Sequence, residues 1–349
     1  MLVANRPIIS VNTERLEQNG ISGEELARYF PRYILNPTPL YYSRSKQVWF
    51  FIVRMFLTAL VKIFLRPRKS SGNLDIQEVD RVYTKGAATY DKKHHITTRG
   101  MDLVWRRMAG WFISVIGRNN TKTIRVLDLC TGTGLTIKEI TSVLKEWRIE
   151  AEIIGLDYNE KMLDIARRNL GVNNNIKLVQ GDAMNMNNIS PDSIDVVTQV
   201  FGIGGISEPT KVFHEVLRIL KPGGWFFMID MHKPIPEQPG EWPFFLKWLR
   251  FPIFESVVYE ESTLPVVLKR LWGWRDPTLC FYLLSLTVHR DDNGRYFGFN
   301  VNNFAQDSQR WWFALPLMPV AQIIVEKVEI SEQEARKRKL IFESCFLIE

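Results

Sequence analysis

The chain has 349 residues, of which 46% are hydrophobic and 24% are charged. This usage is ordinary for a globular protein and excludes global disorder, and a chain of this length buries enough surface to fold without disulfide or metal staples. The three cysteines, Cys130, Cys280 and Cys345, are odd in number and widely spaced. The sequence therefore contains neither a disulfide framework nor a paired-cysteine zinc site, and it favours a reducing compartment.

The net charge of +7 is concentrated at the N-terminus. Residues 1–70 contain eleven Lys or Arg and four acidic residues, so the rest of the chain is neutral overall. An excess of positive charge is typical of proteins that contact nucleic acid or an anionic membrane. Any such contact is therefore expected within the first 70 residues.

Residues 47–65 form a nearly continuous apolar segment. Arg54 and Lys62 lie inside it and share one side of a helix with Thr58, and each charge would cost about 2.5–3.5 kcal/mol near a bilayer centre. We expect an amphipathic helix in the membrane interface, with residues 44–69 contacting the surface. The alternatives are a helix packed on the protein's own core and a transmembrane span.

A Ser- and Gly-containing linker divides the chain near residue 76. We expect residues 1–76 to form a basic extension and residues 77–349 to form the main domain. From about residue 125, apolar β-branched runs alternate with helical patterns, which predicts a parallel sheet covered by helices on both faces. The expected strands are residues 124–129, 151–157, 176–182, 194–202 and 224–230, and the expected helices are residues 135–147, 159–170 and 208–220.

The core of the main domain is expected to span residues 77–240, followed by two further regions. Residues 241–320 contain six of the eleven tryptophans, which favours an insertion that caps an apolar substrate pocket or touches a membrane. A larger hydrophobic core is the plain alternative. Residues 321–349 are expected to form a terminal pair of strands, at 323–331 and 339–348, joined by a charged, solvated turn.

The first expected strand of the sheet runs into a glycine-rich turn at residues 130–134, and a helix follows. Glycines there let the backbone approach a ligand where a Cβ would clash. The second strand ends in Asp157, placed to accept hydrogen bonds from both ribose hydroxyls of an adenosine. The third ends near Asp182, placed to reach an adenine amino group. Because the carboxyl ends of parallel strands share one edge of a sheet, these elements should meet in one crevice.

These spacings resemble those of class I S-adenosylmethionine-dependent methyltransferases. Within that class, four segments are similar to the ubiquinone/menaquinone biosynthesis C-methyltransferase family, namely residues 90–107, 156–163, 201–202 and 216–224. The resemblance covers about residues 78–234. It implies a Rossmann-like, seven-stranded α/β sheet, mostly parallel with an antiparallel last strand, which carries the N-terminal helical extension and the aromatic-rich insertion. It also implies S-adenosyl-L-methionine as the cofactor.

The resemblance further implies the residues that bind this cofactor. Asp128, Gly132 and Gly134 match the first motif of the class. Tyr90 belongs to a segment whose family counterpart closes over the cofactor, and Met162 is expected on the adenine face, with core filling as the alternative. The full expected set is Tyr90, Asp128, Cys130, Thr131, Gly132, Gly134, Asp157, Tyr158, Met162, Asp182, Ala183 and Gln199.

The chain departs from the family pattern at two places. Cys130 stands where the first motif usually has glycine. Residues 203–206, Ile-Gly-Gly-Ile, replace a Leu-Arg-Asn stretch that the family associates with its quinol substrate. An NAD dehydrogenase is disfavoured, because the third glycine of the dinucleotide pattern falls on Ile137.

Methyl transfer from a sulfonium needs mainly in-line positioning in a water-poor site, plus a base where the acceptor carries a proton. The candidate bases are His232, directly after the fifth strand, and His94 and His95, beside Tyr90. The alternative is that these are ordinary solvated or structural histidines. No metal is expected, because the His94–His95 pair lacks a third ligand at a suitable spacing.

We therefore expect an S-adenosylmethionine-dependent methyltransferase whose small lipophilic, membrane-associated acceptor, a quinone precursor or related lipid, enters under a cap built from residues 78–107 and 241–320. The alternatives are a phospholipid or amine N-methyltransferase and a non-catalytic cofactor-binding scaffold of a membrane biosynthetic complex. The expected location is cytoplasmic, at the inner face of a membrane. Nucleic acid is not an expected partner, because the aromatic region lacks excess positive charge and no base-methylation motif follows the fourth strand. The sequence carries no signal for an oligomeric state.

Overall fold

The computed structural model of the protein describes residues 8–11, 13–22, 76–98, 100–118, 122–231, 283–300 and 320–348. The expected membrane helix at 47–65, most of the expected cap at 241–320, and His232 lie outside the described residues. Within the described ranges, no helix is both long enough and apolar enough to cross a membrane.

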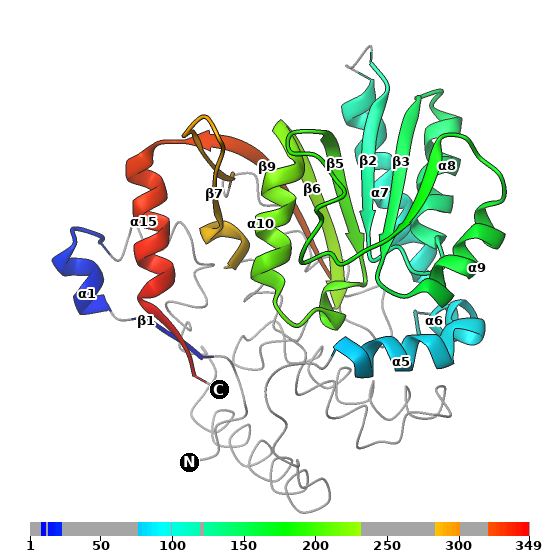
Figure 1. Cartoon of the computed structure of the whole chain (residues 1–349), viewed down its shortest axis with the longest axis horizontal. Coiled ribbons are helices and arrows are strands. Elements are labelled where there is room, and N and C mark those ends of the chain that lie inside the picture. Colours follow the sequence, from blue (N-terminus) through cyan, green and yellow to red (C-terminus); the bar gives the residue numbers. More distant parts are fainter. Residues whose placement is uncertain are drawn as a thin grey trace, which may run out of the picture.

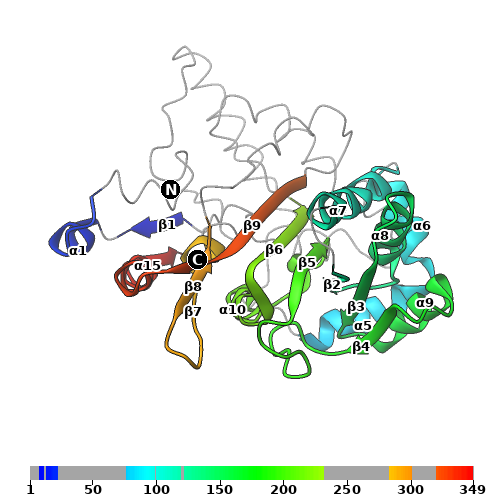
Figure 2. The ribbon, with the colours of Figure 1, turned by 90° about the horizontal axis from the view of Figure 1, so that it is seen from above.

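The centre of the structure is an eight-stranded sheet with the strand order β4-β3-β2-β5-β6-β9-β8-β7 (Figures 1 and 2). The strands are β2 (Ile124–Leu129), β3 (Ala151–Asp157), β4 (Ile176–Gln180), β5 (Ile194–Val200), β6 (Leu220–Met231), β7 (Val288–Arg290), β8 (Tyr296–Phe299) and β9 (Val320–Ile330). The first five in this order pair in parallel, and β9 runs antiparallel to β6. The expected α/β class, the five expected strands and the antiparallel strand are confirmed.

The strand count differs from the expected seven because β7 and β8, which lie within the expected insertion at 241–320, both join the sheet, whereas the expected strand at 339–348 does not. Strand β7 lies at the edge of the sheet. It pairs antiparallel with β8 over three residues. The turn between them is closed by Asp291, whose carboxylate accepts hydrogen bonds from the Arg295 backbone and guanidinium at 2.7 and 2.9 Å.

Helices cover both faces of the sheet (Figure 2). One face carries α7 (Met101–Gly117), α8 (Leu135–Glu146) and α9 (Glu160–Leu170), and the other carries α10 (Pro209–Ile219). Alternate residues of β2 enter different cores: Val126 packs in the cluster that contains Trp105 and Ile140, and Leu127 in the cluster that contains Phe213. Burial on both faces explains why the strand sequences are continuously apolar.

Three short helical elements lie across the edge of the sheet where the parallel strands end (Figure 1). They are α5 (Ile76–Gly86), the 3-10 turn η1 (Ala87–Thr89) and α6 (Tyr90–Thr98). Two side-chain contacts fasten them to the sheet. The Asn159 amide donates to the Asp80 carboxylate at 2.7 Å, and the Thr133 hydroxyl donates to Asp91 at 2.6 Å.

The C-terminal segment corrects the expected strand pair. The charged run is not a turn but a helix, α15 (Glu332–Glu343), and the last strand is only β10 (Cys345–Ile348). Ser331 caps the helix by accepting the Glu334 backbone N–H at 3.1 Å, and Glu334 accepts from Arg338 at 2.8 Å, one turn further on. Charges spaced four apart stabilise a helix, so the run that resembled a solvated turn is a helix face.

The two chain ends meet outside the main sheet. Strand β10 pairs antiparallel with β1 (Ile8–Val11), and α1 (Thr13–Gln18) follows β1 (Figure 1). Leu16 and Ile21 are buried in the same core cluster as the sheet residues. Residues 8–22 of the basic extension therefore support the fold of the main domain.

Candidate functional site

An open cavity, whose empty space together with the solvent at its mouth measures about 780 Å³, lies between the carboxyl ends of the parallel strands and the helices α5 and α6. Eight of the expected cofactor residues line it, namely Tyr90, Cys130, Gly132, Asp157, Tyr158, Met162, Asp182 and Ala183. The sheet therefore brings together the turn after β2 and the acids that follow β3 and β4.

The turn after β2 leaves part of its backbone bare toward the cavity. Gly132 and Gly134 both have positive φ, at 57° and 80°. A Cβ on Gly134 would lie 3.0 Å from Leu170, so this glycine permits close packing against α9. A Cβ on Gly132 would meet only the end of Met162, at 3.5 Å, so this glycine opens to the cavity.

Asp157 joins the glycine turn to the end of β3. Its carboxylate accepts the Gly132 backbone N–H at 2.7 Å and the Asn159 backbone N–H at 2.9 Å. Burial raises the pKa of this carboxyl, and the two backbone donors oppose that shift. A carboxylate has about four lone-pair sites, so Asp157 can also accept hydrogen bonds from a ligand in the cavity.

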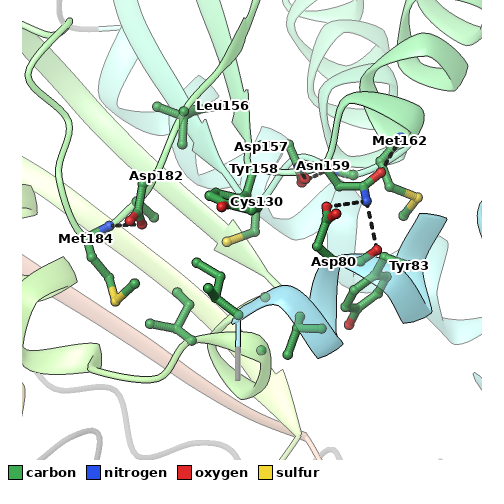
Figure 3. Close-up of a pocket in the computed structure, with 18 of the residues that line it drawn as sticks. Asp80, Tyr83, Cys130, Leu156, Asp157, Tyr158, Asn159, Met162, Asp182 and Met184 are labelled. Carbon is green, nitrogen blue, oxygen red and sulfur yellow. Dashed lines mark hydrogen bonds between the residues drawn. The ribbon is translucent and has the colours of Figure 1, made fainter. Parts of the chain in front are cut away.

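Asp182 lies across the cavity from the N-terminal helices. Its carboxylate accepts the Met184 backbone N–H at 2.8 Å, which holds the side chain in place after β4. Figure 3 shows Asp182 and Met184 on one side, Asp80 and Tyr83 on the other, and Cys130 between them. The two acids at the strand ends therefore face one shared space.

Asp128 and Gln199 do not line the cavity but brace its wall. Asp128 is buried and accepts the hydroxyls of Thr131 and Thr198 at 2.7 and 2.8 Å, and burial raises its pKa to about 6. Gln199 donates to the Asp230 carboxylate at 3.1 Å. Thr131 and Gly134 likewise do not line the cavity. These four residues fix the turn and the end of β5 from behind.

The residues that sequence reasoning missed come mainly from α5 and from the loop after β5. Ile76, Val79 and Tyr83 line the cavity from α5, and Ile206 and Ser207 from the loop. The α5 residues recur at helical spacing, i, i+3 and i+7, and this pattern could have identified them in the sequence as one face of a helix. The sequence had placed the segment over the pocket without naming these side chains.

The two adjacent histidines of α6 have different surroundings. His94 is 7% exposed and its ring contacts the rings of Tyr90 and Phe201, both of which line the cavity. His95 has a side chain that is 55% exposed. In the part of the chain that the structure describes, no cluster of three His, Cys, Asp or Glu residues could hold a metal ion.

The residues around the cavity fit S-adenosylmethionine. The bare backbone at Gly132 and the Asp157 carboxylate suit an adenosine, and Asp182 adds a second acceptor in the same space. The parallel strands, with β9 antiparallel beside β6, have the order expected for the sheet of a class I methyltransferase. Fold and site together define a class I S-adenosylmethionine-dependent methyltransferase.

Comparison with known proteins gives the family. The sequence model of the ubiE/COQ5 methyltransferase family matches residues 72–262, which is more than half of the chain, and the chain belongs to that family. Demethylmenaquinone methyltransferase of Clavibacter sepedonicus is 25% identical over 200 residues, which cover 57% of this chain and 77% of that protein. The ubiquinone/menaquinone biosynthesis C-methyltransferase UbiE of Pseudomonas fluorescens is 32% identical over 162 residues, which cover 45% of this chain and 59% of that protein.

Solved structures were also compared. Phosphoethanolamine N-methyltransferase 1 of Haemonchus contortus gives a TM-score of 0.48 at 15% identity and covers 77% of this chain and 52% of that one. An S-adenosylmethionine-dependent methyltransferase from Aquifex aeolicus gives 0.39 at 14% identity and covers 72% of this chain and 98% of that one.

Proposed function

We propose that this methyltransferase methylates a ring carbon of a lipophilic hydroquinone, a precursor in quinone biosynthesis. The observation that carries the proposal is the mixed lining of the cavity. It includes Gly132, Asp157 and Asp182 as well as the apolar side chains Val79 and Ile206. A polar cofactor and an apolar acceptor can therefore occupy one space. The names of the curated relatives, demethylmenaquinone methyltransferase among them, support the choice of acceptor.

In this proposal each part of the wall has one role. Asp157 accepts the ribose hydroxyls, Asp182 accepts the adenine amino group, and Met162 packs on the adenine face. Bound S-adenosylmethionine supplies an electrophilic methyl group on a sulfonium. The acceptor ring is held by Tyr83, Val79 and Ile206, which also exclude water. Displacing water from these apolar surfaces favours a flat, apolar ligand.

The loop after β5 determines how the acceptor is held. Gly205, Ile206 and Ser207 line the cavity, and within residues 203–206, where the family has a polar pair, this chain has only Ile and Gly. This loop thus offers one hydroxyl and otherwise apolar surface. We infer that the acceptor is positioned mainly by shape and apolar contact, so a hydroquinone with an isoprenoid tail suits it better than a charged headgroup.

The test is methyl transfer by the full chain from methyl-labelled S-adenosylmethionine. Two acceptors are offered in mixed micelles: a chemically reduced demethylmenaquinone with a short isoprenoid tail, and phosphatidylethanolamine. We expect label on the ring carbon of the quinol. Label on the amine supports the alternative lipid N-methyltransferase and refutes the quinol. Label in neither, with cofactor binding intact by calorimetry, refutes both acceptors.

We also propose that residues 44–69 hold the enzyme against an anionic membrane surface, where a lipophilic acceptor resides. Each Lys or Arg near such a surface contributes about 1 kcal/mol. Replacing Arg66, Arg68 and Lys69 by Gln should therefore weaken binding to vesicles of phosphatidylglycerol and phosphatidylcholine on the order of 100-fold. The measurement is vesicle co-sedimentation at low salt.

The control removes the same charge elsewhere. Lys161, Arg336 and Lys339 lie exposed on α9 and α15, and their replacement by Gln should change vesicle binding little. Truncation of residues 1–70 is a poor substitute for this test, because it removes β1 and the buried Leu16. Equal binding by both triple variants would contradict a specific role for residues 44–69.

A further inference from the structure

A buried pair of titratable side chains lies directly behind the cavity wall. His94 on α6 points its Nδ1 toward Asp102 on α7, 3.6 Å from the Oδ2 atom. Asp102 is 1% exposed and accepts the Thr98 hydroxyl at 2.8 Å on its other oxygen. At 3.6 Å the two side chains face each other without a hydrogen bond between these atoms, and the burial of both carries a cost in desolvation.

The His94 imidazole adjoins the cavity through two aromatic rings. Its ring centre lies 5.0 Å from that of Phe201, in an edge-on arrangement, and 5.6 Å from that of Tyr90. Phe201 has a φ of 65°, which is strained for a phenylalanine and places its ring at the end of β5. The pair thus stands one side chain away from the space proposed for the acceptor.

The charges around His94 set its protonation state. Burial lowers its pKa, opposed by the facing Asp102, while the positive charge of Arg106 on α7 lowers it further and Asp91 on α6 raises it. Burial alone would raise the pKa of Asp102, but the facing His94 and Thr98 lower it to about 2. At neutral pH the imidazole is therefore neutral beside an ionised carboxylate, so it can accept a proton.

We propose that His94, which faces Asp102, accepts the proton of a ring hydroxyl of the acceptor through one bridging water. This inference rests on the proposed hydroquinone acceptor. The O–H bond breaks, its proton goes to the ring nitrogen of His94 that faces away from Asp102, and its electron pair enters the ring. The ring carbon then forms its bond to the methyl group as the sulfonium becomes a thioether. The same carbon finally releases its hydrogen as a proton, and the oxygen takes back the proton held by His94. The acceptor thus exchanges one hydrogen for one methyl group, with one proton released.

The chemistry requires such a group at neutral pH. A phenolic hydroxyl has a pKa of about 10, so only about one molecule in a thousand is ionised at pH 7. A carboxylate facing Nδ1 holds the proton on that nitrogen and leaves the other nitrogen as the acceptor. In this account His94 is the proton acceptor and Asp102 is a positioning residue.

The first test is the pH dependence of kcat for the full chain with the reduced short-tailed demethylmenaquinone. His94→Gln should lower kcat about 100-fold at pH 7, while S-adenosylmethionine affinity by calorimetry stays within threefold. Its rate should then rise with pH toward the hydroxyl's own pKa, because hydroxide replaces the imidazole. A loss that is equal at every pH overturns the proposal. His214→Gln, which removes an exposed imidazole of α10, serves as the control for the substitution itself.

The second test uses Asp102→Asn. Because the Asp102 charge raises the pKa of His94, its removal should shift the acid limb of the profile to lower pH while lowering kcat. His95 also faces Asp102, with Nδ1 3.3 Å from Oδ1. If His95→Gln, rather than His94→Gln, removes the acid limb, the proposal is wrong.

A third measurement uses the unaltered chain, so it depends neither on turnover nor on the folding of a variant. Nitrogen-15 NMR of the unaltered chain should find neutral His94 protonated on Nδ1, with a pKa below 6.5. The opposite tautomer, protonated on the far nitrogen, overturns the proposal even if the quinol is a substrate. Absence of any quinol methylation by the unaltered chain instead refutes the proposed function, and the proton transfer named here falls with it.

Discussion

Replacing Asp157 by alanine is expected to weaken S-adenosylmethionine binding at least 100-fold. A hydrogen bond to a charged group contributes about 1.5–3 kcal/mol, and the carboxylate is placed to accept two from the ribose. The loss of both corresponds to about 3–6 kcal/mol, and every 1.4 kcal/mol is a factor of ten in affinity. Isothermal titration calorimetry of the full chain measures the effect directly.

The Asp157 experiment needs two controls, because the same carboxylate also accepts the backbone N–H groups of Gly132 and Asn159. Thermal unfolding of Asp157→Ala separates loss of the ligand contact from loss of the turn. Asp164→Ala removes a half-exposed acid of the adjoining helix α9 and should leave affinity unchanged. An Asp157→Ala variant that binds within threefold of the unaltered chain would remove the ribose assignment.

Replacing Gly202 by alanine is expected to destabilise the site by about 1–3 kcal/mol and to weaken cofactor binding at least tenfold. The new Cβ would lie 2.5 Å from the Cβ of Cys130 and 3.0 Å from its sulfur. Neither partner can move at low cost, because Cys130 has a φ of 54° and both residues form the cavity wall. The melting temperature and calorimetric affinity report the two effects.

The chain offers a matched control and a rescue for Gly202. Gly205 lines the same cavity, but its Cβ would meet nothing closer than Val79 at 3.7 Å, so Gly205→Ala should be nearly neutral. Adding Cys130→Gly to Gly202→Ala removes the clashing atom and should restore much of the loss. If Gly202→Ala is as well tolerated as Gly205→Ala, Gly202 does not lie as close to Cys130 as the structure has it.

The strands of the parallel sheet were predictable because their burial on both faces leaves a local signature. Each of β2, β3 and β5 is a short apolar run, and each ends at a residue that the topology carries to the same edge. For the same reason Gly132, Asp157 and Asp182 could be assigned to one crevice before any coordinates. In a parallel sheet, residues that follow the strands in the sequence lie together at one edge of the sheet.

Local pattern failed where distant contacts decide the structure. The run at 332–343 carries local helix signals, the Ser331 cap and charges spaced four apart, which the interpretation as a turn did not weigh. Only the contact of the buried Arg338 with the Phe299 carbonyl, at 3.1 Å, is beyond local pattern. Asp128 matched a cofactor motif, yet its carboxylate is used inside the fold by two threonine hydroxyls. A motif gives residue types and spacing, but not which way a side chain faces.

By itself, the sequence indicated the enzyme class and the cofactor through its resemblance to a methyltransferase family, and strand periodicity placed the candidate cofactor residues at one edge of the sheet. It named His94 and His95 together and could not separate them. Only the tertiary structure did so: the chain reverses at Gly100, whose φ of 80° favours glycine, and α7 then brings Asp102 back beside α6. One imidazole is thereby buried against the aromatic wall while its neighbour stays half exposed, since two adjacent residues of a helix face different directions.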